Sequence, residues 1–168
     1  MQTFFLEQID LIYFFYGLSF FFLSFVSYLL YNTNKKELSW TFLGLFAFFR
    51  GVYQYIVLLE FIFGTQGWLT VVLLLSNAIS FLALFEFGRR GLHREKKLID
   101  IRVYIPMAVL LGLVLWFGGV ENVNLFIRFA VGFPGAVLAG IIFWRWSSVK
   151  SVKTVSYTHL TLPTIYSV

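Results

Sequence analysis

Residues 68–88 read WLTVVLLLSNAISFLALFEFG and are followed at once by Arg89 and Arg90. Apolar side chains occupy consecutive positions from Val71 to Leu75, so the stretch lacks the alternation of apolar and polar residues found in membrane-barrel strands. About 20 residues of apolar α-helix are enough to cross the hydrocarbon core of a bilayer. The stretch therefore predicts a transmembrane helix whose C-terminal end carries fixed positive charge.

Four other stretches have the same apolar character and a comparable length. Together the five predict an all-α fold, a polytopic membrane bundle of transmembrane helices. The predicted helices cover residues 11–31, 40–63, 68–88, 103–117 and 125–144. Trp and Tyr residues lie near most of the predicted helix ends, as is typical of the two membrane–water interfaces.

The composition excludes several classes of protein. Of the 168 residues 60% are hydrophobic and 12% are charged, which leaves too little polar surface to cover a soluble domain. The net charge is +5, but the basic residues lie beside apolar spans rather than on a polar face, so we expect contact with anionic lipid and not with nucleic acid. The chain contains no cysteine, which excludes disulfides and thiolate metal sites.

Positive charge is confined to alternate gaps between the predicted spans. The second and fourth gaps, residues 64–67 and 119–124, contain no Lys or Arg. By the positive-inside rule this pattern predicts an N-terminus outside and a C-terminus in the cytoplasm. The basic residues of the other gaps and of the C-terminal flank are Lys35, Lys36, Arg89, Arg90, Arg94, Lys96, Lys97, Arg102, Arg145, Lys150 and Lys153.

Ionisable residues inside the spans are the first candidates for function. Such residues are costly at membrane depth and usually face the bundle interior with a partner. Glu60 and Arg128 lie at similar depth near the outer ends of their spans, so we expect an ion pair between them. Each of these residues could form a proton, ion or ligand site, or could clamp two helices together or extend to the interface. The four are Arg50, Glu60, Glu86 and Arg128.

Arg50, Tyr53 and Gln54 stand at positions i, i+3 and i+4 and so share one face of the second predicted helix. Arg50 lies about halfway through that span. The face could bind a polar group, or it could satisfy itself against neighbouring backbone carbonyls.

The fifth span contains a repeat of small residues. Gly132, Ala136 and Gly140 recur every four residues and predict a face on which another helix approaches closely. Pro134 removes one backbone hydrogen bond, so we expect it to bend the helix. A kinked, closely packed helix that leads to the cytoplasmic end is typical of a signal conduit, and equally of a plain packing face.

Motifs of soluble enzymes are missing from the chain. It has no glycine-rich phosphate loop and no pair of carboxylates at catalytic spacing. His93 lies in the basic inner gap, where contact with water or lipid headgroups is expected rather than metal binding. We therefore predict no catalytic residue, no metal site and no cofactor.

The C-terminal tail has a separate origin in our interpretation. Residues 155–164 read VSYTHLTLPT and resemble the in-frame translation of a transposon-type sequencing adapter. We therefore divide the chain into a transmembrane region at 1–146, the start of a cytoplasmic linker at 147–154 and a non-native tail at 155–168. On this interpretation the natural reading frame continues beyond Thr154.

Four segments in order along the chain resemble the N-terminal multi-span sensor region of a group of bacterial membrane proteins. In that group the region precedes cytoplasmic modules, commonly PAS with histidine kinase and sometimes a diguanylate cyclase. The resemblance implies a sensory and anchoring role and a homodimer. At 50–51 and 54–55 the chain departs from the group, because Arg-Gly and Gln-Tyr replace His-Gly and Glu-Trp, which weakens any pH- or metal-linked role there. The matching segments are Tyr16-Gly17, Phe46–Gly51, Ser80–Arg90 and Ile127–Gly140.

Two other classes of function compete with a sensor region. A small transporter or channel would use Arg50, Glu60, Glu86 and Arg128 to line a polar path. The odd number of spans and the absence of internal repeats count against it. An assembly subunit would be held by the face of Gly132, Ala136 and Gly140.

Overall fold

The computed structural model describes residues 8–33, 38–64, 66–96 and 100–161, and every regular element in those ranges is helical. This confirms the all-α prediction. The elements are α2 (Ile9–Thr33), α3 (Trp40–Phe63), α4 (Gly67–Lys96), the short 3₁₀-helix η1 (Ile101–Val103), α5 (Tyr104–Phe126), the π-helix η2 (Ile127–Gly132) and α6 (Phe133–Thr161).

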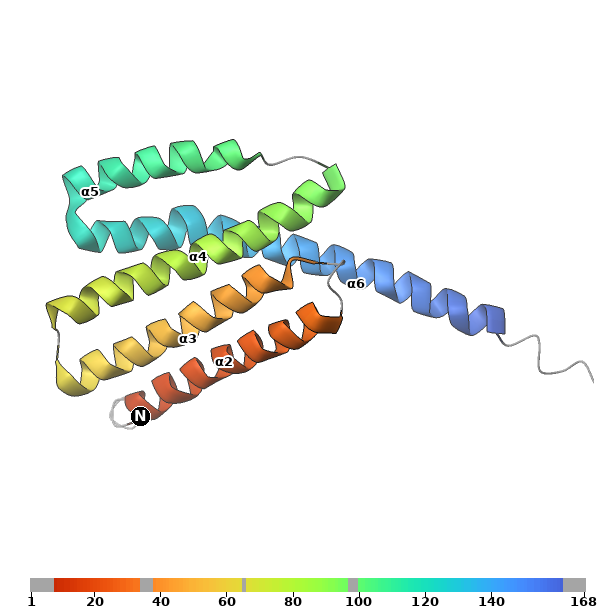
Figure 1. Cartoon of the computed structure of the whole chain (residues 1–168), viewed down its shortest axis with the longest axis horizontal. Helices are drawn as coiled ribbons and strands as arrows, with labels where there is room; N and C mark the ends of the chain where they lie inside the picture. Colours follow the sequence, from red (N-terminus) through yellow and green to blue (C-terminus); the bar gives the residue numbers. More distant parts are fainter. Residues whose placement is uncertain (1–7, 34–37, 65, 97–99, 162–168) are drawn as a thin grey trace, which may run out of the picture.

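The chain runs up and down through an antiparallel bundle (Figure 1). Helix α4 lies in the middle, with α3 on one side and η2 and α6 on the other, and α2 packs against α3. The fourth apolar span ends at Gly118 and the fifth begins at Asn122. The chain turns back between these two residues, so that the first part of α5 lies alongside η2. As a result the α2–α3 connection, the α4–η1 connection and the outgoing α6 share one end of the bundle (Figure 1).

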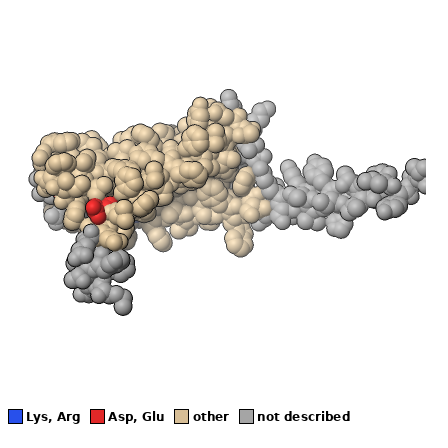
Figure 2. Space-filling view, turned by 90° about the horizontal axis from the view of Figure 1, so that it is seen from below, with Lys and Arg blue, Asp and Glu red and all other residues tan. Residues whose placement is uncertain are grey.

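The outer surface of the bundle is apolar. Five helices are long and apolar enough to cross a membrane. Large hydrophobic side chains on several of them are widely exposed, among them Phe22 at 69%, Trp116 at 84% and Phe129 at 72%. Figure 2 shows one face of the molecule on which acidic atoms are visible at one end and no Lys or Arg is visible. Because an apolar surface of this extent is unfavourable in water, the chain is a multi-pass membrane protein.

The best-packed part of the bundle lies between α3, α4 and α6. Trp40 and Leu43 of α3 pack with Phe87 of α4 and with Ala139 and Ile142 of α6. Helices α2 and α3 approach closely at two glycines, because a Cβ on Gly51 would lie 3.3 Å from the carbonyl oxygen of Gly17. These contacts fix α4 between α3 and α6.

One predicted boundary was wrong. Helix α4 does not end at Gly88 but continues to Lys96, because Arg89 and Arg90 pair with Glu86 one turn back and so extend the helix. The predicted connection at 119–124 does contain the reversal of the chain, although its residues are helical as far as Phe126, and Asn122 Nδ2 donates a hydrogen bond of 2.6 Å to the carbonyl oxygen of Gly118. The second span, in contrast, was predicted with both ends correct.

Within this single chain, only part of the small-residue repeat predicted on the fifth span packs against another helix. Gly132 and Gly135 face the bundle, where a Cβ on Gly135 would lie 3.0 Å from the backbone nitrogen of Phe85. Ala136 and Gly140 are exposed, and a Cβ on Gly140 would meet no atom within 4 Å. The large side chains decide the register, because the inward face of α6 also carries the buried Ile142. Residues 162–168 of the predicted tail lie outside the described residues.

Candidate functional site: two polar clusters within the bundle

A chain of polar side chains crosses the middle of the bundle. Arg50 Nη1 donates a hydrogen bond of 2.8 Å to Asn77 Oδ1, and Asn77 Nδ2 donates one of 2.6 Å to Asn124 Oδ1. The three residues belong to α3, α4 and α5. We call Arg50, Tyr53, Asn77 and Asn124 the Arg50 cluster. It joins three helices through hydrogen bonds that are partly buried within the bundle.

Aromatic rings complete the surroundings of the Arg50 side chain. Its Cζ lies 4.7 Å from the ring centre of Tyr53 and 5.0 Å from that of Phe81. Within the described residues no carboxylate forms an ion pair with it. Cation–π contacts, one amide and a side-chain hydrogen bond with Tyr16 therefore hold this positive charge, without an ion-paired carboxylate among the described residues.

Asn77 is the centre of this cluster. Its side chain is completely buried, and so is that of Ser80, whose Oγ donates a hydrogen bond of 2.8 Å to the carbonyl oxygen of Asn77. Since an amide both accepts and donates, Asn77 can connect a guanidinium on one side to a second amide on the other. A carboxylate at this position could accept from Arg50 but could not donate to Asn124.

Only part of the polar face predicted on α3 belongs to the Arg50 cluster. Tyr53 contacts Arg50 as its spacing suggested, and the cluster continues from Arg50 onto α4 and α5 rather than along α3. Gln54 is buried, with 4% of its surface exposed, and among the described residues no hydrogen bond joins it to Arg50.

The predicted ion pair between Glu60 and Arg128 does not form. Glu60 Oε1 instead accepts a long hydrogen bond of 3.5 Å from Thr70 on α4, and Arg128 is exposed. The reason is the order of the helices, because α4 separates α3 from η2. Arg128 nevertheless lies within electrostatic reach of Arg50.

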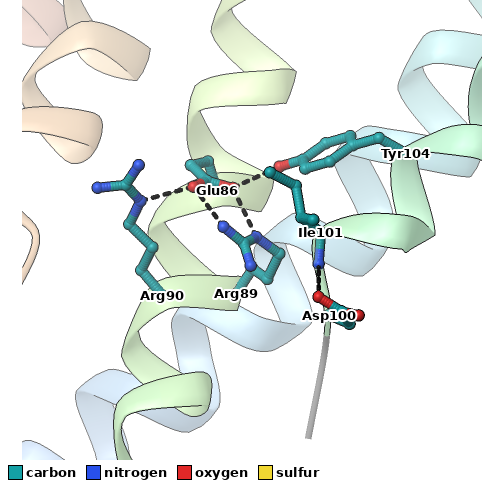
Figure 3. A network of polar contacts seen from close by, with 6 residues as sticks. All are labelled: Glu86, Arg89, Arg90, Asp100, Ile101 and Tyr104. Carbon is teal, nitrogen blue, oxygen red and sulfur yellow. Dashed lines mark hydrogen bonds and ion pairs between the residues drawn. The ribbon is translucent and has the colours of Figure 1, made fainter. Parts of the chain in front are cut away.

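A second cluster surrounds Glu86 at the end of the bundle where α6 leaves it (Figure 3). Arg89 donates two hydrogen bonds of 2.7 Å to the two carboxylate oxygens, and Arg90 Nε donates one of 2.6 Å to Oε1. The hydroxyl of Tyr104 donates a fourth, of 2.6 Å, to Oε2. Because Tyr104 begins α5, Glu86 ties α4 to α5 through charge-assisted bonds.

The cluster also reaches α3. The Cζ of Arg90 lies 4.4 Å from the ring centre of Phe42. Nearby, Asp100 Oδ1 accepts a hydrogen bond of 2.7 Å from the backbone N–H of Ile101 and so caps η1 (Figure 3). Arg89, at 9% exposure, is buried in this network. The basic gap after residue 88 is therefore in part an ordered clamp.

The disturbance expected at Pro134 takes the form of a π-helix. The backbone N–H of Phe133 bonds to the carbonyl of Arg128, five residues back, and η2 covers Ile127–Gly132. Pro134 has no N–H for the carbonyl of Ala130, and its ring would collide with that carbonyl in a regular α-helix. A wider turn before the proline relieves both problems. This turn begins three residues after Asn124, so the Arg50 cluster adjoins it.

Several members of the two clusters were missed in the sequence. Asn77 and Asn124 carry neutral amides, so they were not among the ionisable residues predicted as candidates. Asn77 does stand with Ser76 in an otherwise apolar span, and that interruption was a usable signal. The spacing of Glu86 to Arg89 and Arg90 at i+3 and i+4 was a second one.

The chemistry that these clusters support is binding and coupling. Among the described residues no three His, Asp or Glu side chains gather in a group that could hold a metal ion. Comparisons with protein-family models, with curated proteins and with solved structures found no match for this chain.

Proposed function

We propose that this chain is the membrane-embedded sensory and anchoring region of a bacterial signal-transduction protein, located in the inner membrane with its C-terminus in the cytoplasm. The observation that carries the proposal is the bond chain from Arg50 through Asn77 to Asn124. That chain ends next to η2, and η2 continues directly into α6. A polar centre inside the membrane is thus attached to the helix that leaves it.

Helix α6 is suited to carry a signal. The apolar part of the last span ends at Ser147, whereas the helix continues through Thr154, the last residue before the tail that we interpret as non-native. Figure 1 shows this helix extending well beyond the other elements of the bundle. A rotation or shift of its membrane part would therefore reach the exit side without an intervening loop.

The Arg50 cluster and η2 together provide a place where two packings can differ. A π-helical turn can move along a helix or convert to α-helix by a change of one residue in register. A stimulus that binds one packing more tightly than the other would shift the balance between them. Because the outer connections are short, the stimulus has to reach the bundle itself or arrive through the lipid.

The output module in this proposal is a histidine kinase, or a diguanylate cyclase, and the parent protein acts as a homodimer. These parts depend on the resemblance described above. Recovery of the intact reading frame tests them, and we expect a PAS, kinase or cyclase module after Thr154. A frame that reaches a stop codon without any such module would overturn the proposal.

The intact protein also permits a functional test of the coupling. We expect Asn77→Leu to change the basal kinase or cyclase activity at least about three-fold, because loss of the hydrogen bonds to Arg50 and Asn124 alters the balance of packings by roughly 1 kcal/mol. Asn122→Leu is the matched control, since Asn122 is exposed and bonds only within its own helix. Substrate flux through reconstituted vesicles that requires Arg50 would instead favour a transporter.

A further inference from the structure

The guanidinium of Arg50 has donors that the protein does not use. A guanidinium can donate from each of its nitrogens, and here Nη1 donates to Asn77 Oδ1 at 2.8 Å. The further contact with the Tyr16 hydroxyl occupies at most one of Nε and Nη2. Within the described residues, Trp40 Nε1 is the single fully enclosed side-chain nitrogen or oxygen without a partner, so the unused nitrogen of Arg50 is accessible. An acceptor from outside the protein can therefore reach it.

The charge of Arg50 also lacks a counter-ion. In the described part of the chain it takes part in no ion pair. Glu60, on the same helix, lies ten positions further on, about 15 Å along the axis, and accepts a hydrogen bond from Thr70. A cation inside a membrane bundle is costly unless an opposite charge is near, so an anion beside Arg50 would be stabilised.

A second arginine adds to this positive field. Arg128 of η2 is exposed, and it lies within electrostatic reach of Arg50. Among the residues that the structure describes, it too forms no ion pair. Two like charges repel each other in surroundings of low dielectric constant, and an anion that is close to both relieves that repulsion. The pair therefore favours a negatively charged ligand over a neutral one.

The depth of Arg50 restricts which anion can reach it. Along the axis of α3 it lies at least about 15 Å from either end of the helix. Phosphate and the phosphodiester of a lipid headgroup remain charged and stay outside the hydrocarbon layer, whereas a carboxylic acid can enter it in its neutral form. As an anion, a carboxylate matches the planar fork of a guanidinium. The rings of Tyr53 and Phe81, at 4.7 and 5.0 Å from Arg50 Cζ, provide apolar surface for the rest of the molecule.

We propose that Arg50 and Arg128 together bind the carboxylate of an apolar acid, such as a fatty acid, that arrives through the lipid. The unused donor of Arg50 holds a carboxylate oxygen, and Arg128 contributes its charge from η2. The hydrogen bond from Arg50 to Asn77 stays in place, so the bound acid would adjoin the bond chain to Asn124. This inference concerns binding alone and does not depend on the proposed function.

The experiment is a titration of the purified chain, in a non-ionic detergent, with laurate that carries an isotope-labelled carboxyl carbon. Nuclear magnetic resonance of that carbon reports both binding and protonation. We expect one saturable site with at least about ten-fold preference for laurate over dodecanol, a neutral amphiphile of the same chain length, measured by displacement. Bound laurate should also lose its proton at least about one pH unit below laurate in micelles without protein, because a guanidinium stabilises the anion. Equal affinities, or equal midpoints of titration, would overturn the proposal.

Arg128→Gln and Arg102→Gln form a matched pair of variants. Arg128→Gln removes one of the two charges and should weaken laurate binding about three-fold. Arg102 is 84% exposed and pairs with Asp100, so its replacement should leave the affinity unchanged. The reverse result would mean that the acid binds at the interface, and would overturn the proposal.

Arg50→Gln tests the centre of the site. This variant should lose the preference for laurate over dodecanol, because it keeps an amide donor but not the charge. If it does not fold, the protonation of bound laurate and the pair of variants above still decide the question. Displacement of laurate by inorganic phosphate would also overturn the proposal, since the site would then take an anion from water rather than from the lipid.

Discussion

Arg50 Nη1 and Asn77 Oδ1 lie 2.8 Å apart, so a fixed positive charge in the middle of a membrane bundle is held by a neutral amide. A carboxylate would neutralise the charge but would end the network there. Asn77 continues it, because its Nδ2 donates to Asn124. The bundle thus keeps a net charge at its centre in exchange for a link between three helices.

Replacement of Asn77 by Leu should therefore cost stability as well as coupling. Leu is similar in size but leaves both Arg50 and Asn124 without a partner, so we expect the free energy of unfolding to fall by about 2 kcal/mol. Unfolding in detergent, followed by circular dichroism, measures the change. Asn122→Leu, at an exposed amide two residues from Asn124, should cost less than about 0.5 kcal/mol. Equal losses in the two variants would mean that the bond chain contributes nothing.

Glu86→Gln should weaken the clamp at the exit side. The substitution keeps the shape of the side chain but removes the charge that two arginines share, and Arg89 is 9% exposed. Because an uncompensated buried guanidinium would remain, we expect a loss of about 2 kcal/mol in the free energy of unfolding.

Arg102→Gln is the control for that prediction. Arg102 lies 3.6 Å from Asp100 in a pair whose side chains are 84% and 66% exposed, so its loss should cost less than about 0.5 kcal/mol. Thermal unfolding of the two variants in the same detergent gives the comparison. If Arg102→Gln lowers the free energy of unfolding as much as Glu86→Gln does, then charge rather than burial determines the stability of this end of the bundle.

The spans were predictable because the bilayer imposes a length and a polarity that a single sequence displays directly. The second span was correct at both ends because its limits are local: Gly64, with φ of +80°, adopts a conformation that other residues rarely accept. The end of α4 was missed because its extension depends on ion pairs along the helix rather than on hydropathy.

The clusters were harder to predict because they depend on which helices are neighbours. The positions of Glu60 and Arg128 along their spans predicted a similar depth in the membrane. Depth alone could not show that α4 lies between the two helices that carry them. Asn77 and Asn124 are 47 positions apart and meet only because α4 packs against the turn into η2. For a related reason, a spacing of four residues could not show that Gly132 packs inside the bundle while Ala136 and Gly140 lie on its surface.

The packing of α4 against α6 makes a direct prediction for two glycines. A Cβ on Gly88 would collide with the Cβ of Leu138, whereas a Cβ on Gly140 meets open space. Gly88→Ala should therefore lower the free energy of unfolding by about 1–3 kcal/mol, and Gly140→Ala should leave it unchanged or raise it slightly. The opposite order, measured by thermal unfolding, would contradict this packing of Gly88 against Leu138.

The orientation of the bundle is open to a test by reporter fusions after Lys36, Gly67, Lys97 and Asn122. The bundle alternates in direction, so these positions should alternate between the two sides of the membrane. The positive-inside rule then assigns Lys36 and Lys97 to the cytoplasm. Alkaline phosphatase activity should be high at Gly67 and Asn122, and fluorescence of a green fluorescent protein should be high at the other two. An inverted pattern would remove the cytoplasmic output module from consideration.

Pro134 should control whether Asn124 reaches Asn77. With Ala at position 134 the carbonyl of Ala130 regains a donor, so η2 can become α-helix, and the segment before it would turn by about 100° relative to α6. Asn124→Ala should then cost about 1 kcal/mol in the unaltered chain and close to zero in the Pro134→Ala background. A double-mutant cycle of unfolding free energies measures this difference, with Asn122→Ala as the variant expected to be additive. Additivity of Asn124→Ala as well would mean that the π-helical turn plays no part in holding the bond chain to α6.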